Sequence, residues 1–311
     1  LAPGVSLGAS FTTPPLGADD RYAYGEDFLS GSSEFFRYTD GYVRLDSING
    51  AAFGFDQVSL VYGWNVSIGE LGIAMPWIDP DIVAETMMIG SASLDSWRLD
   101  LFDMQLPDYE DSTHLVGGNL VWYLGDRGAL SGSYINVVRS DDYWALRDGI
   151  SAYAVRGDVV PFRNLPALSI AGEYVALRGS GQYLDRYDSN GWSLRASYAA
   201  YDWPMQPIFT YLYSQLSGET NYFDDSWSDF DNMFLAQNNY RDGHYNGNLS
   251  SFAMDLFGNR AIHELRLELA PMPSMFISAS YFRFELLEGD VLCSYSSRNL
   301  GDELKLQFGW Y

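Results

Sequence analysis

Charged side chains recur at every second position within several apolar runs of this chain. Near residue 265, Glu264, Arg266 and Glu268 alternate with leucines, and Glu303 and Lys305 do the same near residue 304. The full candidate set has eleven members: Arg98, Asp100, Arg156, Asp158, Glu173, Arg195, Glu264, Arg266, Glu268, Glu303 and Lys305. Neighbouring guanidinium and carboxylate groups offer bidentate hydrogen bonds to hydroxylated or carboxylated solutes. The alternative is that these charges only brace one another across an interior.

A second candidate site lies in the long acidic and aromatic segment 219–248. It carries four aspartates that are close in sequence: Asp224, Asp225, Asp229 and Asp231. A connection this long within a compact protein is usually functional or disordered. We expect the region 218–260 to form a long extracellular or pore-constricting loop. The aspartates are candidate gate residues, and Ca²⁺ binding is an alternative, although their spacing matches no recognised Ca²⁺ loop.

The sequence gives little indication of catalysis. Its three histidines, His114, His244 and His263, stand far apart and lack metal-ligand spacing, so we expect neither a metal site nor a cofactor. One alternative stays open, because some outer-membrane barrels are hydrolases that use a Ser and a His on neighbouring strands. His263 begins one predicted strand, and Ser278 and Ser280 lie on the next. Without a nucleophile signature around these serines, we expect that the protein is not an enzyme.

The elements that would position the charged residues are long β-strands. Alternation of apolar and polar residues over about ten positions is the strand pattern, and it is longer here than the five or six residues usual in globular proteins. A tilted strand that crosses a bilayer needs about 9–11 residues. Strands are predicted at 42–48, 55–63, 65–75, 114–124, 128–138, 149–159, 167–178, 191–201, 206–217, 261–270, 274–285 and 302–311. The region 76–113 has room for two more, because Arg98 and Asp100 alternate with apolar residues.

The connections between these strands alternate in length. Short ones are expected at 63–64, 125–127, 161–166, 202–205 and 271–273, and long ones at 76–113, 139–148, 179–190, 218–260 and 286–301. Short turns on one side and long loops on the other are typical of an up-and-down transmembrane β-barrel with periplasmic turns and extracellular loops. We therefore predict an all-β, antiparallel transmembrane barrel of about 12–14 strands, or more if the chain is incomplete. Both ends of the chain would lie on the periplasmic side.

A membrane setting would explain the sorting of side chains. In lipid the sheet has to close so that all backbone groups are paired, and an outward arginine at mid-bilayer costs about 2–4 kcal/mol. Aromatic residues near strand ends fit the two interfacial girdles of a barrel. These residues are Trp64, Trp122, Tyr123, Trp192, Trp203, Trp310 and Tyr311. The alternative reading of each is a core aromatic of a soluble β-protein.

Composition narrows the class of partner. The 311 residues include 41 acidic and 18 basic side chains, a net charge of −23, so nucleic acid would be repelled. The single cysteine, Cys293, excludes an internal disulfide, and no run of 18 apolar residues predicts a transmembrane helix. The chain starts without Met, which fits a processed product. We expect one domain over 1–311, with an irregular lead-in at 1–40.

The second half of the chain resembles the alginate-export family of outer-membrane β-barrel proteins. The likeness is best over 191–311 and is carried by "GWSLRASYAAYDWPMQPIFTYLYSQLSGE", "FDNMF", "GNLSSFAMDLFGN", "HELRLELAPMPSMFISASYFRFE" and "SRNLGDELKLQFGWY". The "LGDEL" after a loop and the "DLFG" before a strand are its most specific parts. Upstream, "AAFGFDQVSLVYG" is similar to a hairpin of that family.

The resemblance implies a monomeric pore that exports a polysaccharide through the outer membrane of a Gram-negative bacterium. In that family arginines line an anion-selective channel, which would map onto Arg156, Arg195 and Arg266. This chain departs from the family in having fewer strands and a mixed wall, with five cations and six carboxylates among the eleven candidates. A polyanion would also meet acidic outer loops, so a neutral or zwitterionic glycan or small solutes fit the charges better.

Three functions remain as expectations. The first is an outer-membrane channel or porin that passes a polysaccharide or small hydrophilic solutes, with lipid and the solute as its partners. The second is a structural or adhesion barrel whose acidic loops bind a periplasmic or surface protein in a larger assembly. The third is a barrel-embedded hydrolase.

Overall fold

The structure is a computed structural model of the chain. It describes residues 5–12, 38–48, 55–67, 83–107, 112–140, 148–180, 186–219, 226–230, 258–287 and 299–310. Within these ranges the elements are β-strands and one short 3-10 helix, Gly125–Arg127. No helix among them is both long enough and apolar enough to span a membrane.

The strands are long and follow one another along the chain. Their bounds are β1 Val5–Thr12, β2 Tyr38–Ile48, β3 Gln57–Ser67, β4 Val83–Leu94, β5 Trp97–Pro107, β6 Ser112–Tyr123, β7 Gly128–Arg139, β8 Ser151–Val159, β9 Leu168–Gly179, β10 Arg186–Ala199, β11 Ile208–Leu216, β12 Ser226–Trp227, β13 Arg260–Met272, β14 Met275–Leu286 and β15 Asn299–Trp310. Most reach the length that a tilted membrane-crossing strand needs.

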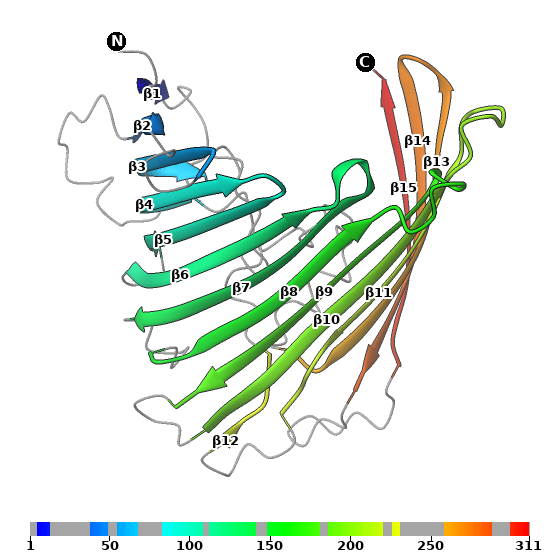
Figure 1. Ribbon diagram of the computed structural model, residues 1–311. Helices are drawn as coiled ribbons and strands as arrows, with labels where there is room; N and C mark the ends of the chain where they lie inside the picture. Colours follow the sequence, from blue (N-terminus) through cyan, green and yellow to red (C-terminus); the bar gives the residue numbers. More distant parts are fainter. Residues whose placement is uncertain are drawn as a thin grey trace, which may run out of the picture.

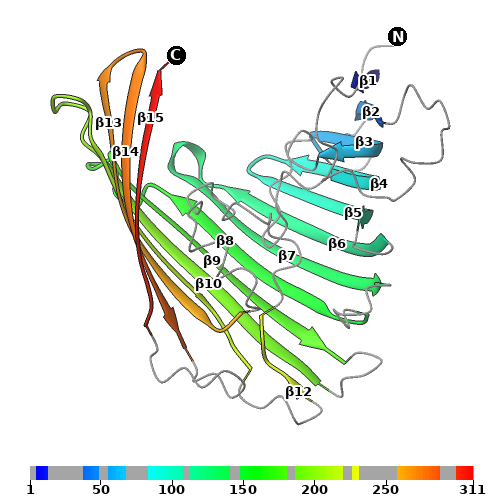
Figure 2. The same ribbon diagram turned by 180° about the vertical axis from the view of Figure 1, so that it is seen from behind.

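All fifteen strands belong to one sheet. Fourteen of them pair in sequence order, each antiparallel to the next, and the two-residue β12 lies off this path and pairs in parallel with β10. The prediction of an all-β, up-and-down antiparallel fold with 12–14 strands is therefore confirmed. Figure 1 shows the sheet as a strongly curved wall seen from its convex side, and Figure 2 looks into the concave side.

The sheet has two edges instead of the predicted closure. Among the described residues, β1 pairs with β2 alone and β15 pairs with β14 alone. The two edge strands stand on opposite sides of a wide opening (Figure 1). The sheet nevertheless curves in one direction from β1 to β15, as a wall around an interior does (Figures 1 and 2).

Short and long connections follow the predicted alternation only in part. The connections 95–96, 124–127, 160–167, 200–207 and 273–274 join strands at one end, here called the turn side. The other ends, here called the loop side, are joined by segments that are described only in part. Most of them are longer, but 108–111 and 180–185 are shorter than the turn-side connections 160–167 and 200–207. Four of the five predicted short turns fall on the turn side. The last strand, β15, also ends on the turn side.

The fifth predicted turn is wrong. Residues 63–64 lie inside β3, where Gly63 pairs with Met87 and Trp64 pairs with Thr86 on β4. Glycine is tolerated within a strand where a neighbouring backbone approaches closely, so it is weak evidence for a turn. The predicted break at 63–64 therefore does not exist, and the part of the predicted strand 65–75 beyond residue 67 lies outside the described residues.

Two further regions can be compared with the expectations, and only the second differs from them. The possible extra pair of strands in 76–113 is real, since β4 and β5 form a hairpin around residues 95–96, with Asp95 in the left-handed region at φ 50°. The lead-in 1–40, predicted to be irregular, contains β1, which pairs with β2 from Val5 to Thr12. Its run "VSLGASF" alternates like the other strands but is too short to be recognised without its partner.

The largest packed core lies on the loop-side half of the concave face. It contains Val61, Ile89, Phe102, Met104, Leu115, Ile135, Val137, Val175 and Leu177, with further residues from β4, β8, β10 and β11, and each is buried. A smaller cluster of Ile262, Phe282 and Phe284 continues it toward β15. The turn-side half of the same face is polar, and it is there that the charged residues lie.

Candidate functional site: the charged concave face

All eleven charged residues predicted to line an interior lie on one face of the sheet. Residues opposite each other on antiparallel strands share a face, and alternate residues along a strand share it too. One cross-strand row contains Arg98 and continues through Arg156 and Glu173. The next contains Asp158, Arg195, Glu264 and Glu303, and a third contains Arg266 and Lys305. Asp100 and Glu268 lie two residues from Arg98 and Arg266.

Ion pairs link neighbouring members of these rows. Arg98 Nε donates to Asp100 Oδ1 over 2.8 Å, and Asp100 is almost fully buried. Arg195 Nη2 lies 3.5 Å from Asp158 Oδ2 on the strand two positions away. Because Arg98, Arg195 and Arg266 each have a carboxylate beside them, the wall is an array of opposite charges and has no single sign.

The most buried of these pairs is on β13. Arg266 Nε donates to Glu264 Oε1 over 2.8 Å and also to the hydroxyl of Ser280 over 3.1 Å, while Glu264 is 0% exposed. Arg266 Nη1 reaches Glu268 at 4.0 Å. Arg156 and Glu173 face each other directly across β8 and β9. Sequence spacing therefore placed these groups together correctly, although it could not say which of them would pair.

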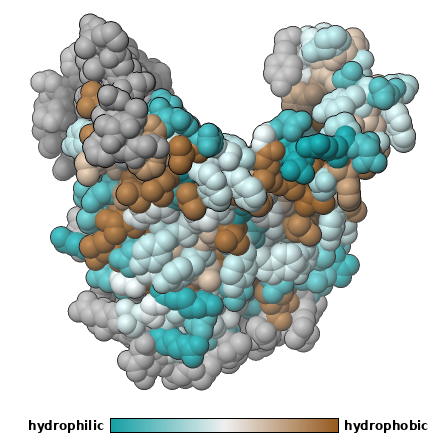
Figure 3. All heavy atoms as spheres, in the orientation of Figure 1, coloured by the Kyte–Doolittle hydropathy of each residue, from teal (hydrophilic) through white to brown (hydrophobic). Residues whose placement is uncertain are grey.

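The opposite, convex face is apolar over the turn-side half. Exposed side chains there include Leu99, Leu101, Leu120, Leu130, Val155, Leu194, Leu265, Leu304, Leu306 and Phe308, and Leu304 and Leu306 are 67% and 71% exposed. Figure 3 shows this side, with brown apolar residues and pale aromatic ones across the strands and teal groups toward the rims. A soluble protein rarely exposes so large a contiguous apolar surface.

Aromatic side chains gather at the turn-side margin of this surface. Trp97 and Trp122 stack with ring centroids 5.3 Å apart and an interplanar angle of 7°. Of the aromatics predicted to form girdles, Trp122, Trp203 and Trp310 are exposed near turn-side strand ends. Tyr123 is also exposed, but it shares the concave face with Arg98 and so is not part of this margin. Trp192 lies further along β10 and packs on Tyr213. The side chain of Trp64 and the whole of Tyr311 lie outside the described residues.

Both faces reverse their polarity toward the loop side, which the sequence analysis did not predict. On the convex face Leu101 is followed by Asp103 on β5, and Leu304 is preceded by Asp302 on β15. On the concave face the change runs the other way, from Asp100 to Phe102 on β5. The loop-side part of the sheet thus resembles a water-soluble β-protein, with a polar outside and the packed core described above within.

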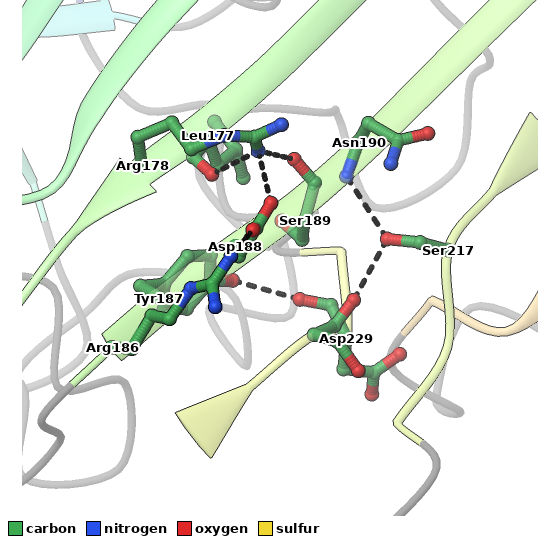
Figure 4. A network of polar contacts seen from close by, with 10 residues as sticks. Leu177, Arg178, Arg186, Tyr187, Asp188, Ser189, Asn190, Ser217 and Asp229 are labelled. Atoms are coloured by element: carbon green, nitrogen blue, oxygen red, sulfur yellow. Dashed lines mark hydrogen bonds and ion pairs between the residues drawn. The ribbon is translucent and has the colours of Figure 1, made fainter.

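A segment of the long connection after β11 is pinned against this loop-side core. We call residues 226–230 the strap. Ser217, which follows β11, donates from Oγ to the Ser228 carbonyl over 2.7 Å, and its own carbonyl accepts the N–H of Phe230 over 3.1 Å. Tyr187 on β10 donates to the carbonyl of Asp229 over 2.8 Å. Figure 4 shows these contacts converging on Ser217 from Asn190 and from the strap.

The strap reaches the concave face through Phe230. A Cβ added to Gly191, a concave-face position on β10, would lie 3.0 Å from the Phe230 ring, so that ring covers the glycine. Phe230 belongs to the large core, and Trp227 packs against it. Of the four candidate gate residues, only Asp229 lies within the described residues, and it is buried; Asp224, Asp225 and Asp231 lie outside them, so the gate role stays a prediction. The contacts of Ser217 and Tyr187 with the strap were not predicted, because nothing in the local sequence of either residue indicates that a distant segment packs there.

The possible Ser and His pair of a hydrolase is not assembled. His263 faces outward on β13, where it contacts Tyr211 Oη through Nδ1 at 2.9 Å. Ser278 and Ser280 on β14 share the concave face with Glu268 and Arg266 and are buried. The two kinds of side chain therefore point to opposite sides of the sheet, which contradicts that alternative. His244 lies outside the described residues, and no metal-binding cluster of His, Cys, Asp or Glu occurs in the described ranges.

Comparisons of sequence identify no relative. No protein-family model matches the chain, and no curated protein matches it significantly. The alginate-export resemblance therefore stays a prediction.

Comparison of structure finds outer-membrane channels with weak overall agreement. A variant of OccD1 (OprD) matches at 14% identity over 83% of this chain, with a TM-score of 0.47, and OprD of Pseudomonas aeruginosa matches at 12% over 84%, with a TM-score of 0.48. Pseudomonas aeruginosa OccK5 (OpdH) matches at 11% over 88%, with a TM-score of 0.44. The matches cover 60%, 64% and 71% of those three chains. These values assign no activity to this chain.

Proposed function

We propose that the chain forms the wall of a channel in a bacterial outer membrane, through which small hydrophilic solutes pass along the charged concave face. One observation carries this proposal: eleven ionisable residues share the concave face, while leucines, valines and aromatics occupy the convex face of the same strands. A lipid-facing surface and a wet interior require this division. A soluble β-sheet with so many exposed leucines would aggregate.

The proposed setting also requires that both sheet edges be paired in the membrane. Unpaired backbone N–H and C=O groups cost several kcal/mol each in hydrocarbon, because no water is present to satisfy them. The edge strand β15 is 12 residues long and carries the most exposed leucines among the described residues. Closure of the wall is thus part of the proposal.

The paired charges support a solute that is neutral or zwitterionic. Arg98, Arg195 and Arg266 each lie against a carboxylate, so the wall offers donors and acceptors side by side and little net attraction for either ion. A polysaccharide of the kind implied by the alginate-export likeness remains the finer alternative within this function. A polyanionic chain would be repelled by a protein of net charge −23, whereas hydroxyl groups would bind to such a wall.

The packed loop-side core supports a second candidate, a structural barrel with a closed interior and acidic loops that bind a protein partner. Phe230 and the core beneath it occupy the concave face at the level where a channel would open to the loop side. In a channel, the strap would instead be the constriction that solutes pass.

Single-channel recording distinguishes the two functions. The folded protein, reconstituted in planar lipid bilayers, is expected to give discrete conductance steps in 1 M KCl, and heat-unfolded protein serves as the control. Addition of a neutral oligosaccharide should reduce the current in a concentration-dependent way. Correctly folded protein that inserts into the bilayer but never conducts would overturn the channel proposal in favour of the closed barrel.

A further inference from the structure

Four polar side chains lie side by side on the convex face where its apolar surface ends. Tyr213 on β11 is opposite His263 on β13, His263 is opposite Arg283 on β14, and Arg283 is opposite Asp302 on β15. We call these four residues the polar row. The adjacent row toward the turn side contains Tyr211, Leu265, Tyr281 and Leu304. The polar row therefore marks the boundary of the apolar surface on four consecutive strands.

An apolar groove begins directly below the polar row. It has a volume of about 460 Å³. Its walls include Tyr211, Leu265, Leu267, Ala279, Tyr281 and Leu304, all on the convex face. The groove thus runs from the polar row into the apolar surface, and its chemistry suits a hydrocarbon chain.

The polar row carries charges of both signs. Arg283 Nε donates to Glu285 Oε1 over 2.6 Å, and the arginine side chain stays 47% exposed. Tyr281 donates to Asp302 over 2.8 Å. Beside them, His263 is held by Tyr211 and by the ring of Tyr213, whose centroid lies 4.7 Å away. A headgroup placed here meets a guanidinium, an imidazole and two carboxylates.

We propose that the polar row and the groove below it bind a membrane lipid with a phosphoethanolamine headgroup. The acyl chain fills the groove, and the phosphate accepts hydrogen bonds from Arg283 and His263. When Tyr211 donates its hydroxyl hydrogen to Nδ1 of a neutral His263, the imidazole proton is on Nε2, which becomes the donor to phosphate. The headgroup ammonium pairs with Asp302 and Glu285, whose charges would repel a headgroup that carries phosphate alone.

This inference rests on the membrane setting of the proposed function and does not require conduction. It predicts a specific site, because both parts of the lipid are recognised at once. A chain without a headgroup or a headgroup without chains makes only part of the contacts.

Native mass spectrometry of the detergent-solubilised protein tests the site. Dipalmitoyl phosphatidylethanolamine is expected to remain bound, whereas dipalmitoylglycerol and glycerophosphoethanolamine are not. Arg283→Gln and His263→Phe should each weaken binding roughly tenfold, the loss typical of one hydrogen bond to a charged group. The matched control is Arg163→Gln in the exposed turn 160–167, which should bind the lipid normally.

The outcomes separate this inference from the channel proposal. Unchanged binding by Arg283→Gln, equal binding of dipalmitoylglycerol, or tighter binding of dipalmitoyl phosphatidic acid would each overturn the assigned headgroup site. Arg283→Gln should conduct like the unaltered protein in planar bilayers, which shows that it folds. Absence of conductance in both proteins would leave the lipid site standing and remove the channel.

Discussion

Glu264 and Arg266 form an ion pair on the concave face of β13, with Glu264 Oε1 2.8 Å from Arg266 Nε and the glutamate 0% exposed. Two residues of one strand pair here because alternate side chains share a face and reach along it. The uncharged hydroxyl of Ser280 on β14 accepts a second hydrogen bond from the same arginine. The pair is thus fixed by two strands and enclosed by the wall.

Loss of the cation from this pair should be costly. Arg266→Gln leaves the buried carboxylate of Glu264 without its cation, and removing one partner of a buried pair typically costs about 3–5 kcal/mol. Urea titration followed by tryptophan fluorescence would measure the free energy of unfolding. The double variant Glu264→Gln/Arg266→Gln should lose less than the single one. Equal losses would show that the buried charge is not what destabilises the single variant.

Position on the sheet should decide the effect of a new charge. Leu306→Arg places a guanidinium on the convex face, and we expect a loss of about 2–4 kcal/mol in the free energy of folding into lipid vesicles. Gln307→Arg, one residue further along β15, faces inward and should cost much less. If the two substitutions cost the same, or if Gln307→Arg costs more, the proposed orientation of β15 is wrong.

The strap should limit conductance if the chain is a channel. A Cβ on Gly258 would lie 2.1 Å from the Ser217 carbonyl and 2.7 Å from the Phe230 nitrogen, so Gly258→Ala should displace the strap. We expect larger single-channel conductance than in the unaltered protein. Gly90→Ala is the control, because a Cβ there meets nothing within 4 Å. Identical conductance in all three proteins would exclude the strap as the constriction.

Ion selectivity should follow the charges of the concave face. Asp158→Asn removes a carboxylate that lies beside Arg195. It should shift the reversal potential in a KCl gradient toward the value of an anion-selective pore. Arg195→Gln should shift the reversal potential toward the value of a cation-selective pore. Arg163→Gln in the exposed turn should shift it less. A reversal potential insensitive to the first two substitutions would mean that ions do not pass along this face.

The strands and the faces were predictable from sequence because alternation is a local property. Arg98, Arg156 and Arg266 were assigned to one face from period two alone, and the register confirms this. The short turns after β6, β8, β10 and β13 were found for the same reason, since polar or proline-containing breaks interrupt the pattern. The false turn at residues 63–64 arose because glycine is common in both turns and strands.

The loop-side features depend on contacts between distant residues. Burial of Phe230 against Gly191 joins segments 39 positions apart. The hydrogen bonds of Ser217, which follows β11, connect it to β10 and to the strap. The reversal of polarity is present in the sequence, in the step from Asp100 to Phe102, but one such step does not show that neighbouring strands change at the same level. The polar row requires the register of four strands, which no single segment contains.

The most direct test of the central claim is the environment of alternate residues along β15. Single cysteines are introduced at positions 303 to 308 in a Cys293→Ser background, spin-labelled and reconstituted in lipid vesicles. Accessibility to oxygen, which concentrates in hydrocarbon, should peak at 304, 306 and 308, and accessibility to a water-soluble nickel complex should peak at 303, 305 and 307. Equal access of the nickel complex to both sets would show water on both faces and contradict the account.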